Sequence, residues 1–138
     1  MAEKYLIDTS IWVDLYDDRK GFINEPLGDY ALNLLTRIKA KESIIAITDM
    51  LLKELETNYS IAEINGIFKL FEKTSEKIIA TEKQKKEAEK IAIERNVPKG
   101  DALHAIMARD SRLILVSRYK HFKQLADISK SFKPEELI

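Results

Sequence analysis

The stretch KYLIDTSIWVDL, residues 4–15, contains the signals from which the fold can be predicted. Its first part, Tyr5–Ile7, is a short apolar run next to charged residues, which is consistent with a buried β-strand. Asp8 follows directly, and Ser10 can then cap a helix with an apolar inward face. A carboxylate at the end of a buried strand has two explanations. It caps the helix that follows, or it belongs to a site at this end of the strand.

Strand and helix signals alternate from this stretch to the end of the chain. Further strands are predicted at 43–47, 77–80, 113–116 and near 128–132. Helices are predicted over 28–41, 49–58, 61–72, 82–95, 101–109 and 119–126. Because the strands are continuous apolar runs that alternate with helices, we expect an α/β fold. Its architecture is a three-layer α/β/α sandwich with a mainly parallel central sheet.

The composition is ordinary for one folded domain. With 45% apolar and 33% charged residues among 138, the chain can bury a substantial core. No repeat, low-complexity tract or linker rich in Pro and Gly divides it, so we expect a single domain over residues 1–138. Lys plus Arg and Asp plus Glu number 23 each, so the net charge is zero and any nucleic-acid site has to be local.

The sequence lacks the signals of membrane insertion and secretion. No apolar run approaches the roughly 20 residues that span a bilayer, and no basic segment followed by an apolar one marks a secretory signal. The absence of cysteine excludes disulfides and thiolate metal sites and fits a reducing interior. We therefore expect a cytoplasmic protein with no membrane partner.

Three acidic residues lie where this fold is expected to form a ligand site. In a parallel α/β sheet the binding crevice lies beyond the carboxyl ends of the strands. Asp8 ends the first strand, Glu54 lies one helical turn beyond the second strand, and Asp101 opens the most apolar helix. Taken singly, each has a structural explanation, since aspartate is a preferred helix cap and Glu54 can pair with a lysine.

Taken together, the three carboxylates predict a cation site. Carboxylates brought to one edge of a sheet repel one another unless a cation lies between them. Oxygen ligands alone suit Mg²⁺ or Mn²⁺, with water and a substrate phosphate in the remaining positions. Such a site supports hydrolysis of a phosphodiester, because the metal lowers the pKa of bound water and neutralises the charge that develops on the phosphate.

Four blocks of the sequence resemble the PIN domain family. They are YLIDTSIWVDL at 5–15, ITDMLLKELE at 47–56, GDALHAIMA at 100–108 and LILVSRYKHFKQL at 113–125. Their order and spacing extend over nearly the whole chain. PIN domains are metal-dependent ribonucleases, and small single-domain members resemble VapC-type toxins of type II toxin–antitoxin pairs. The resemblance therefore implies an endoribonuclease that acts on RNA with Mg²⁺ or Mn²⁺, together with an antitoxin partner and a homodimer.

The resemblance also implies which residues form the site. Asp8, Glu54 and Asp101 match the first three metal-binding, catalytic acids of the family. The fourth position differs, because the family commonly has an aspartate where this chain has Tyr119, two residues after Ser117. A phenol with a pKa of about 10 does not replace a carboxylate as a Mg²⁺ ligand at neutral pH. Two functions therefore stay open: an active ribonuclease with three acids, and a catalytically impaired PIN-like module that binds RNA or protein.

Other polar residues near the predicted strand ends have candidate roles around the metal or the substrate. Thr9 and Ser10 are expected to shape the turn that exposes Asp8. Ser117 can position a water molecule beside the metal. Arg118 follows the last central strand and is expected to bring a positive charge to the backbone phosphate of the substrate.

Four further side chains are expected to have structural roles. His104, three residues after Asp101, is within reach of the site but is interpreted as a hydrogen-bonded core histidine. Trp12 is interpreted as a core or dimer-interface residue. Asp14 and Asp49 are expected to face solvent or to cap helices.

Overall fold

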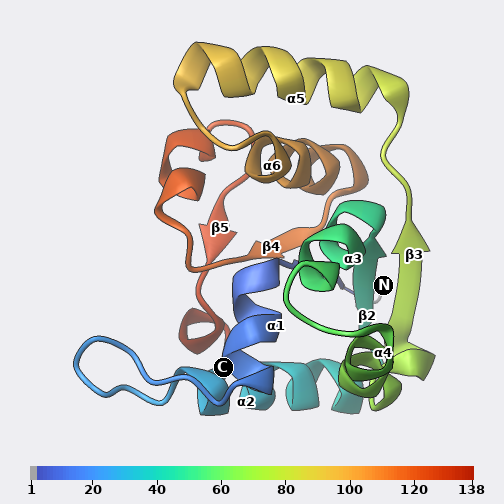
Figure 1. Ribbon diagram of the computed structural model, residues 1–138, viewed down its shortest axis with the longest axis vertical. Coiled ribbons are helices and arrows are strands. Elements are labelled where there is room, and N and C mark those ends of the chain that lie inside the picture. Colours follow the sequence, from blue (N-terminus) through green and yellow to red (C-terminus); the bar gives the residue numbers. More distant parts are fainter. Residues whose placement is uncertain (1–2) are drawn as a thin grey trace.

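A five-stranded parallel sheet forms the middle of the structure, in the order β3-β2-β1-β4-β5 (Figure 1). Its strands are β1 (Lys4–Ile7), β2 (Ile44–Thr48), β3 (Ser75–Ile78), β4 (Ile114–Val116) and β5 (Ser131–Phe132). This computed structural model describes residues 3–138, so the first two residues of the predicted domain 1–138 lie outside the described residues.

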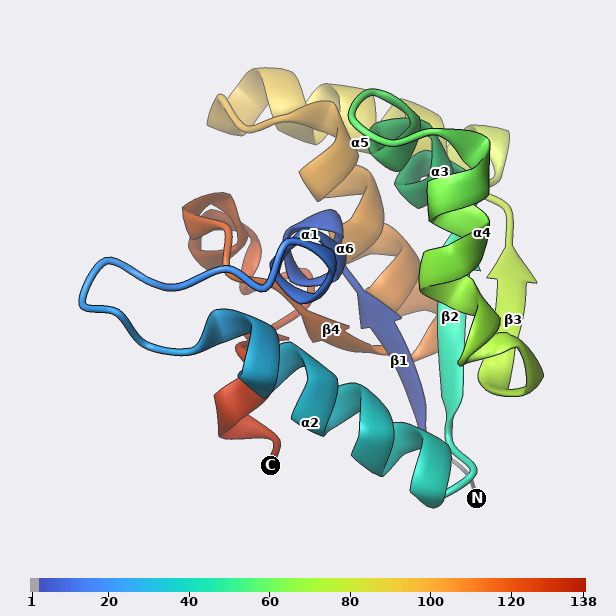
Figure 2. The same cartoon turned by 60° about the horizontal axis from the view of Figure 1, so that its bottom comes forward.

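Helices cover both faces of the sheet. They are α1 (Thr9–Tyr16), α2 (Leu27–Ala40), α3 (Asp49–Glu56), α4 (Ile61–Lys69), α5 (Glu82–Arg95) and α6 (Lys99–Ser111). Side chains of α1, α2, α3 and α4 pack with Ile7 and Val116 on one face. Side chains of α5 and α6 pack with Leu6 and Leu115 on the other. The ribbon shows these two groups of helices on opposite sides of the sheet (Figure 1 and Figure 2). The predicted three-layer α/β/α sandwich with a mainly parallel sheet is confirmed.

The junction of β1 and α1 is fixed by the core. Leu6 and Ile7 are both fully buried on opposite faces, as expected for a central strand between two helical layers. Trp12 packs edge-on against Phe68 of α4, with ring centroids 4.6 Å apart, and its Nε1 donates to the carbonyl oxygen of Ile7 at 3.0 Å. Trp12 is thus a core residue that ties α1 to the end of β1, and this tie determines where Asp8 lies.

Two helices begin earlier than predicted, and both changes concern site residues. Asp8, not Ser10, is the N-cap of α1, and its side chain accepts a hydrogen bond from the backbone N–H of Ser10. Helix α6 begins at Lys99, because Pro98 has the extended backbone (φ −59°, ψ 140°) that precedes a helix. Asp101 therefore lies within the first turn of α6, not at its cap.

Strand β3 begins two residues before the strand predicted from the apolar run at 77–80. It pairs with β2 from Ser75, opposite Ile45, to Ile78, opposite Thr48. Because β3 is an edge strand with largely polar residues, its pairing with β2 decides its position more than its hydrophobicity does.

Two predicted helices differ in length or type. The helix predicted over 61–72 ends at Lys69 and is followed by a 3₁₀ turn, Glu72–Thr74. The segment predicted as a helix over 119–126 is a 3₁₀ helix, Lys120–Leu125, and another, Pro134–Glu136, lies near the C-terminus. Within residues 3–138, no helix combines the length and apolar character needed to cross a membrane.

Candidate active site

Asp8 lies at the carboxyl end of β1 and is fully buried. Its Oδ2 accepts hydrogen bonds from the backbone N–H and the hydroxyl of Ser10, at 3.4 and 3.3 Å, and from the Ser117 hydroxyl at 3.1 Å. Its Oδ1 lies 3.2 Å from Nδ1 of His104. Both carboxylate oxygens are therefore held in place by groups from α1, α6 and the end of β4.

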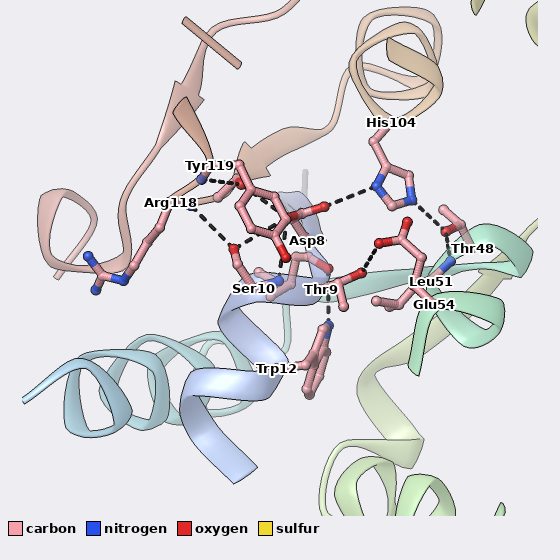
Figure 3. Close-up of polar contacts among 12 residues, drawn as sticks. Asp8, Thr9, Ser10, Trp12, Thr48, Leu51, Glu54, His104, Arg118 and Tyr119 are labelled. Carbon is pink, nitrogen blue, oxygen red and sulfur yellow. Dashed lines mark hydrogen bonds and ion pairs between the residues drawn. The ribbon is translucent and has the colours of Figure 1, made fainter. Parts of the chain in front are cut away.

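Glu54 reaches the same edge from α3. The hydroxyl of Thr48 accepts a hydrogen bond from the N–H of Leu51 at 2.9 Å, so α3 begins directly where β2 ends. Glu54 Oε2 accepts a hydrogen bond from the Thr9 hydroxyl at 2.9 Å, which ties α3 to the first turn of α1 (Figure 3). Burial raises the pKa of the Glu54 carboxyl, and the bond from Thr9 opposes this rise.

Asp101 enters the site from the first turn of α6 and is buried. Burial, followed by the negative charge of Asp8, raises the pKa of its carboxyl to about 6. The charge of Glu54 adds to the rise, while His121 and His104 oppose it. The three predicted acids therefore lie near enough to influence one another electrostatically.

Gly100 allows α6 and Glu54 to approach closely. A Cβ atom at position 100 would lie 3.2 Å from Oε1 of Glu54 and 3.6 Å from Sδ of Met50. The separation of 3.2 Å from Glu54 is shorter than an ordinary van der Waals contact, so a side chain at position 100 would push Glu54 away from α6. The missing side chain keeps room between Glu54 and Asp101.

Tyr119 lies at the position where the resemblance noted in the sequence implies a fourth acid. Its N–H donates to the Ser117 hydroxyl at 3.1 Å, and the residue is 42% exposed. Burial, and then the negative charges of Asp8, Glu54 and Asp101, raise the pKa of the phenol. The phenol therefore keeps its proton at neutral pH and does not supply a fourth anionic oxygen.

Arg118 is paired with two carboxylates, and its expected contact with a substrate phosphate stays a prediction. Its Nε donates to Asp14 at 3.1 Å, and its two terminal nitrogens donate to Glu135 at 2.9 and 2.6 Å. Two carboxylates thus neutralise the guanidinium, while the backbone N–H donates to the Ser10 hydroxyl at 3.3 Å. Asp14 was expected to face solvent or to cap a helix, and this was wrong. It is buried because Arg118 supplies a partner for its charge.

Two residues have contacts that sequence reasoning did not assign. His104 is a fully buried, hydrogen-bonded core histidine, as expected, but one of its two partners is Asp8. The other partner is Thr48, whose Oγ1 lies 2.9 Å from Nε2 of His104. The sequence held one signal for this contact, the position of Thr48. Thr48 ends β2, just as Asp8 directly follows β1, so both lie at the carboxyl ends of neighbouring strands. Asp49, next to it, is exposed in the first turn of α3.

A hard divalent cation suits the donor set, although the side chains do not chelate one as they stand. Within residues 3–138, no three His, Cys, Asp or Glu side chains converge closely enough to hold a metal ion. The oxygens of Asp8, Glu54 and Asp101 are nevertheless the type that Mg²⁺ and Mn²⁺ prefer. A cation among them would relieve the repulsion that contributes to the raised pKa of Asp101.

Comparison with known proteins points to one family. A family model described as PIN domain matches residues 5–128. No curated protein sequence matches the chain.

Several solved structures share the fold. The structure of VapBC2 from Rickettsia felis bound to a DNA fragment from its promoter contains a chain that is 22% identical, with a TM-score of 0.68, covering 94% of this chain and 98% of that one. A toxin–antitoxin complex from Klebsiella pneumoniae gives 20% identity and a TM-score of 0.65, over 94% and 97% of the two chains. PAE2754 from Pyrobaculum aerophilum is 21% identical, with a TM-score of 0.60, and the match covers 99% of this chain and 95% of that one.

Proposed function

The chain belongs to the PIN domain family, and on this premise we propose that it is a metal-dependent endoribonuclease that hydrolyses RNA phosphodiester bonds. The observation that carries the proposal is the approach of three carboxylates, Asp8, Glu54 and Asp101, to one edge of the parallel sheet. Their mutual charge contributes to the raised pKa of Asp101. We propose that these three acids hold Mg²⁺ or Mn²⁺ and are the catalytic residues.

The residues of the chain have distinct parts in this reaction. A bound Mg²⁺ or Mn²⁺ supplies an activated water and stabilises negative charge on the phosphate. Asp8 is held by hydrogen bonds on both oxygens, and Glu54 by the hydroxyl of Thr9, so these two acids are pre-oriented. No hydrogen bond to the Asp101 carboxylate is found among residues 3–138, so its oxygens are available to the cation. The protonated phenol of Tyr119 is suited to donate a hydrogen bond to a phosphate oxygen.

The proposal is tested by RNA cleavage with purified protein. Wild-type protein with Mn²⁺ is expected to cleave single-stranded RNA, and Asp8→Asn to lose about 10²–10³-fold in rate, since one carboxylate of the cation site is lost. The matched control is Asp29→Asn, which makes the same change at an exposed position on α2 and should cleave like wild type. Equal cleavage by wild type and Asp8→Asn would contradict the assignment of Asp8.

The alternative function, a catalytically impaired module that binds RNA or protein, is favoured by a different observation. Tyr119 stands where the family has a fourth acid and keeps its proton. Titration with Mg²⁺ and Mn²⁺ separates the two functions. The nuclease requires saturable metal binding that Asp8→Asn weakens, whereas the absence of binding by wild type supports the module.

We also propose that the chain is the toxin of a type II toxin–antitoxin pair. Two structures with the same fold are toxin–antitoxin complexes, VapBC2 and the Klebsiella pneumoniae complex. The expected partner is an antitoxin that masks the acidic edge, and the expected state of the toxin is a single domain over residues 1–138 that forms a cytoplasmic homodimer. Light scattering of the purified chain tests the homodimer, and co-expression with the product of an adjacent gene tests the antitoxin.

A further inference from the structure

A buried chain of hydrogen bonds connects the start of α3 to Asp8. His104 projects from α6 and lies between Thr48 and Asp8 (Figure 3). Its Nε2 is 2.9 Å from Oγ1 of Thr48, and its Nδ1 is 3.2 Å from Oδ1 of Asp8. Thr48, His104 and Asp8 are each fully buried. The chain is therefore shielded from water and must satisfy its own donors and acceptors.

When the imidazole of His104 is neutral, only one of its two tautomers satisfies all the hydrogen bonds of this chain. The carboxylate of Asp8 can only accept, so the proton of His104 must be on Nδ1. Nε2 is then an acceptor, and the Thr48 hydroxyl donates to it. The oxygen of Thr48 remains free to accept the N–H of Leu51, which it does at 2.9 Å. The carboxylate of Asp8 therefore selects the tautomer of His104, and the Thr48 hydroxyl holds the other side of the ring by donating to Nε2.

These bonds also join the three segments that carry the acids. Thr48 caps α3, which carries Glu54. His104 lies one helical turn after Asp101 on α6. The bonds end on Asp8, after β1. The residues next to His104 along α6 are apolar and buried, so its polar ring is explained by Thr48 and Asp8 and not by the packing of the helix.

We propose that Thr48 and His104 are positioning residues of the metal site. Thr48 anchors the His104 ring through Nε2, and His104 holds Oδ1 of Asp8 while Ser10 and Ser117 hold Oδ2. The inference rests on the proposed function, because the oriented carboxylate is a ligand in that proposal. Partners that orient a ligand typically contribute about 10–100-fold to metal affinity.

The experiment measures Mn²⁺ affinity by calorimetry on four variants of the full chain. Thr48→Val and His104→Phe should each weaken Mn²⁺ binding by about 10–100-fold. Thr48→Ser, which keeps a hydroxyl, should bind like wild type. The double variant Thr48→Val/His104→Phe should bind like His104→Phe alone, because Thr48 acts only through the imidazole.

The matched control separates this role from helix capping. Thr81 caps α5 through the same contact, a hydroxyl that accepts from the N–H of Gln84 at 3.1 Å, and it is remote from the acids. Thr81→Val should therefore leave Mn²⁺ binding unchanged. A further loss of affinity when Thr48→Val is added to His104→Phe would mean that Thr48 acts through the cap of α3, and would overturn the inference.

Nitrogen NMR of the metal-free protein tests the tautomer independently of activity. Wild type and Thr48→Ser should show His104 protonated at Nδ1, with Nε2 accepting a hydrogen bond. Thr48→Val should keep this tautomer, but its Nε2 resonance should shift because the hydrogen bond from Thr48 is lost. If wild type binds no Mn²⁺, the proposed function fails and the positioning role fails with it, whatever the tautomer. If wild type binds Mn²⁺ and Thr48→Val binds equally well, the inference alone fails.

Discussion

Asp8 both caps α1 and belongs to the candidate site, two roles that the sequence presented as alternatives. A carboxylate has about four lone-pair sites, so capping a helix does not exhaust it. Oδ2 accepts from the N–H of Ser10, which caps α1, and from two hydroxyls, while Oδ1 faces His104. The cap places the carboxylate at the end of β1, and the remaining contacts orient it. At the scale of the residue, a structural role of Asp8 therefore supports a role in the site.

Tyr119 yields a prediction about the fourth ligand position. Tyr119→Asp is expected to tighten Mn²⁺ binding on the order of tenfold, because a further carboxylate adds charge and oxygen ligands beside the three acids. Calorimetric titration with Mn²⁺ measures the effect. Tyr119→Asn is the control, since it removes the ring without adding charge and should bind like wild type. Unchanged or weaker binding by Tyr119→Asp would show that this side chain does not face the cation.

Helices α3 and α6 meet at the site because each begins where the sheet edge lies. The Thr48 cap starts α3 at the end of β2, and Pro98 starts α6 at Lys99. Gly100 then lets Oε1 of Glu54 come within 3.2 Å of where a Cβ would be. At the scale of the element, the close approach of α3 to the first turn of α6 sets the spacing of Glu54 and Asp101.

Two glycines in helices are predicted to respond in opposite ways to alanine. Gly100→Ala should displace Glu54 and weaken Mn²⁺ binding several-fold, on the order of 3–10-fold by analogy with disturbed ligand orientation. Gly66→Ala, on α4, meets nothing within 4 Å. It should leave Mn²⁺ binding unchanged and raise the free energy of unfolding by about 0.5–1 kcal/mol, the usual gain from alanine inside a helix. Calorimetry and urea denaturation measure the two effects. Equal Mn²⁺ affinity of the two variants would contradict the role of Gly100.

Arg118 connects parts of the molecule that are far apart in the sequence. It follows β4, and it binds Asp14 of α1 and Glu135 of the C-terminal 3₁₀ helix (Pro134–Glu136). Its side chain is only 15% exposed, and that of Asp14 is 5% exposed. At the scale of the whole molecule, Arg118 therefore holds the end of β4, α1 and the C-terminal segment together behind the site.

Removal of Arg118 should destabilise the whole fold in a way that depends on pH. Arg118→Gln leaves Asp14 buried without its partner and should cost about 2–4 kcal/mol of unfolding free energy near neutral pH. Burial already raises the pKa of Asp14, and the loss of Arg118 removes the larger of the two positive charges that oppose that rise, leaving only Arg19. The pKa of Asp14 is then higher in the folded than in the unfolded state. The loss of unfolding free energy in Arg118→Gln is therefore largest at high pH and shrinks as Asp14 takes up a proton on acidification.

Urea denaturation at about pH 7 and about pH 5 measures this dependence. The double variant Arg118→Gln/Asp14→Asn is the control, because it removes the buried charge and should recover part of the loss at neutral pH. A deficit of Arg118→Gln that is the same at both pH values would show that Asp14 does not carry it.

The parts of the prediction that held came from local patterns. Apolar runs at 43–47 and 113–116 predicted buried strands, and the helices predicted from 49 and 82 begin at these residues, because burial and helix initiation are properties of a few neighbouring residues. The predicted position of β3 was wrong, because its pairing with β2, and not its own hydrophobicity, decides where this edge strand begins. The environment of Arg118 was missed because Asp14 and Glu135 are 104 and 17 positions away in the sequence.

The sequence by itself determined the layered α/β fold and the family, and it predicted the three acids. These follow from periodicity, from the placement of residues at strand ends and from motif order, which are read along the chain. Only the tertiary structure decided which groups hold those acids. Thr48, His104 and Asp8 come from three separate segments, and no local pattern specifies that their donors and acceptors match. The orientation of Asp8 is therefore a property of the packed sheet edge, because it depends on distances between elements that only folding sets.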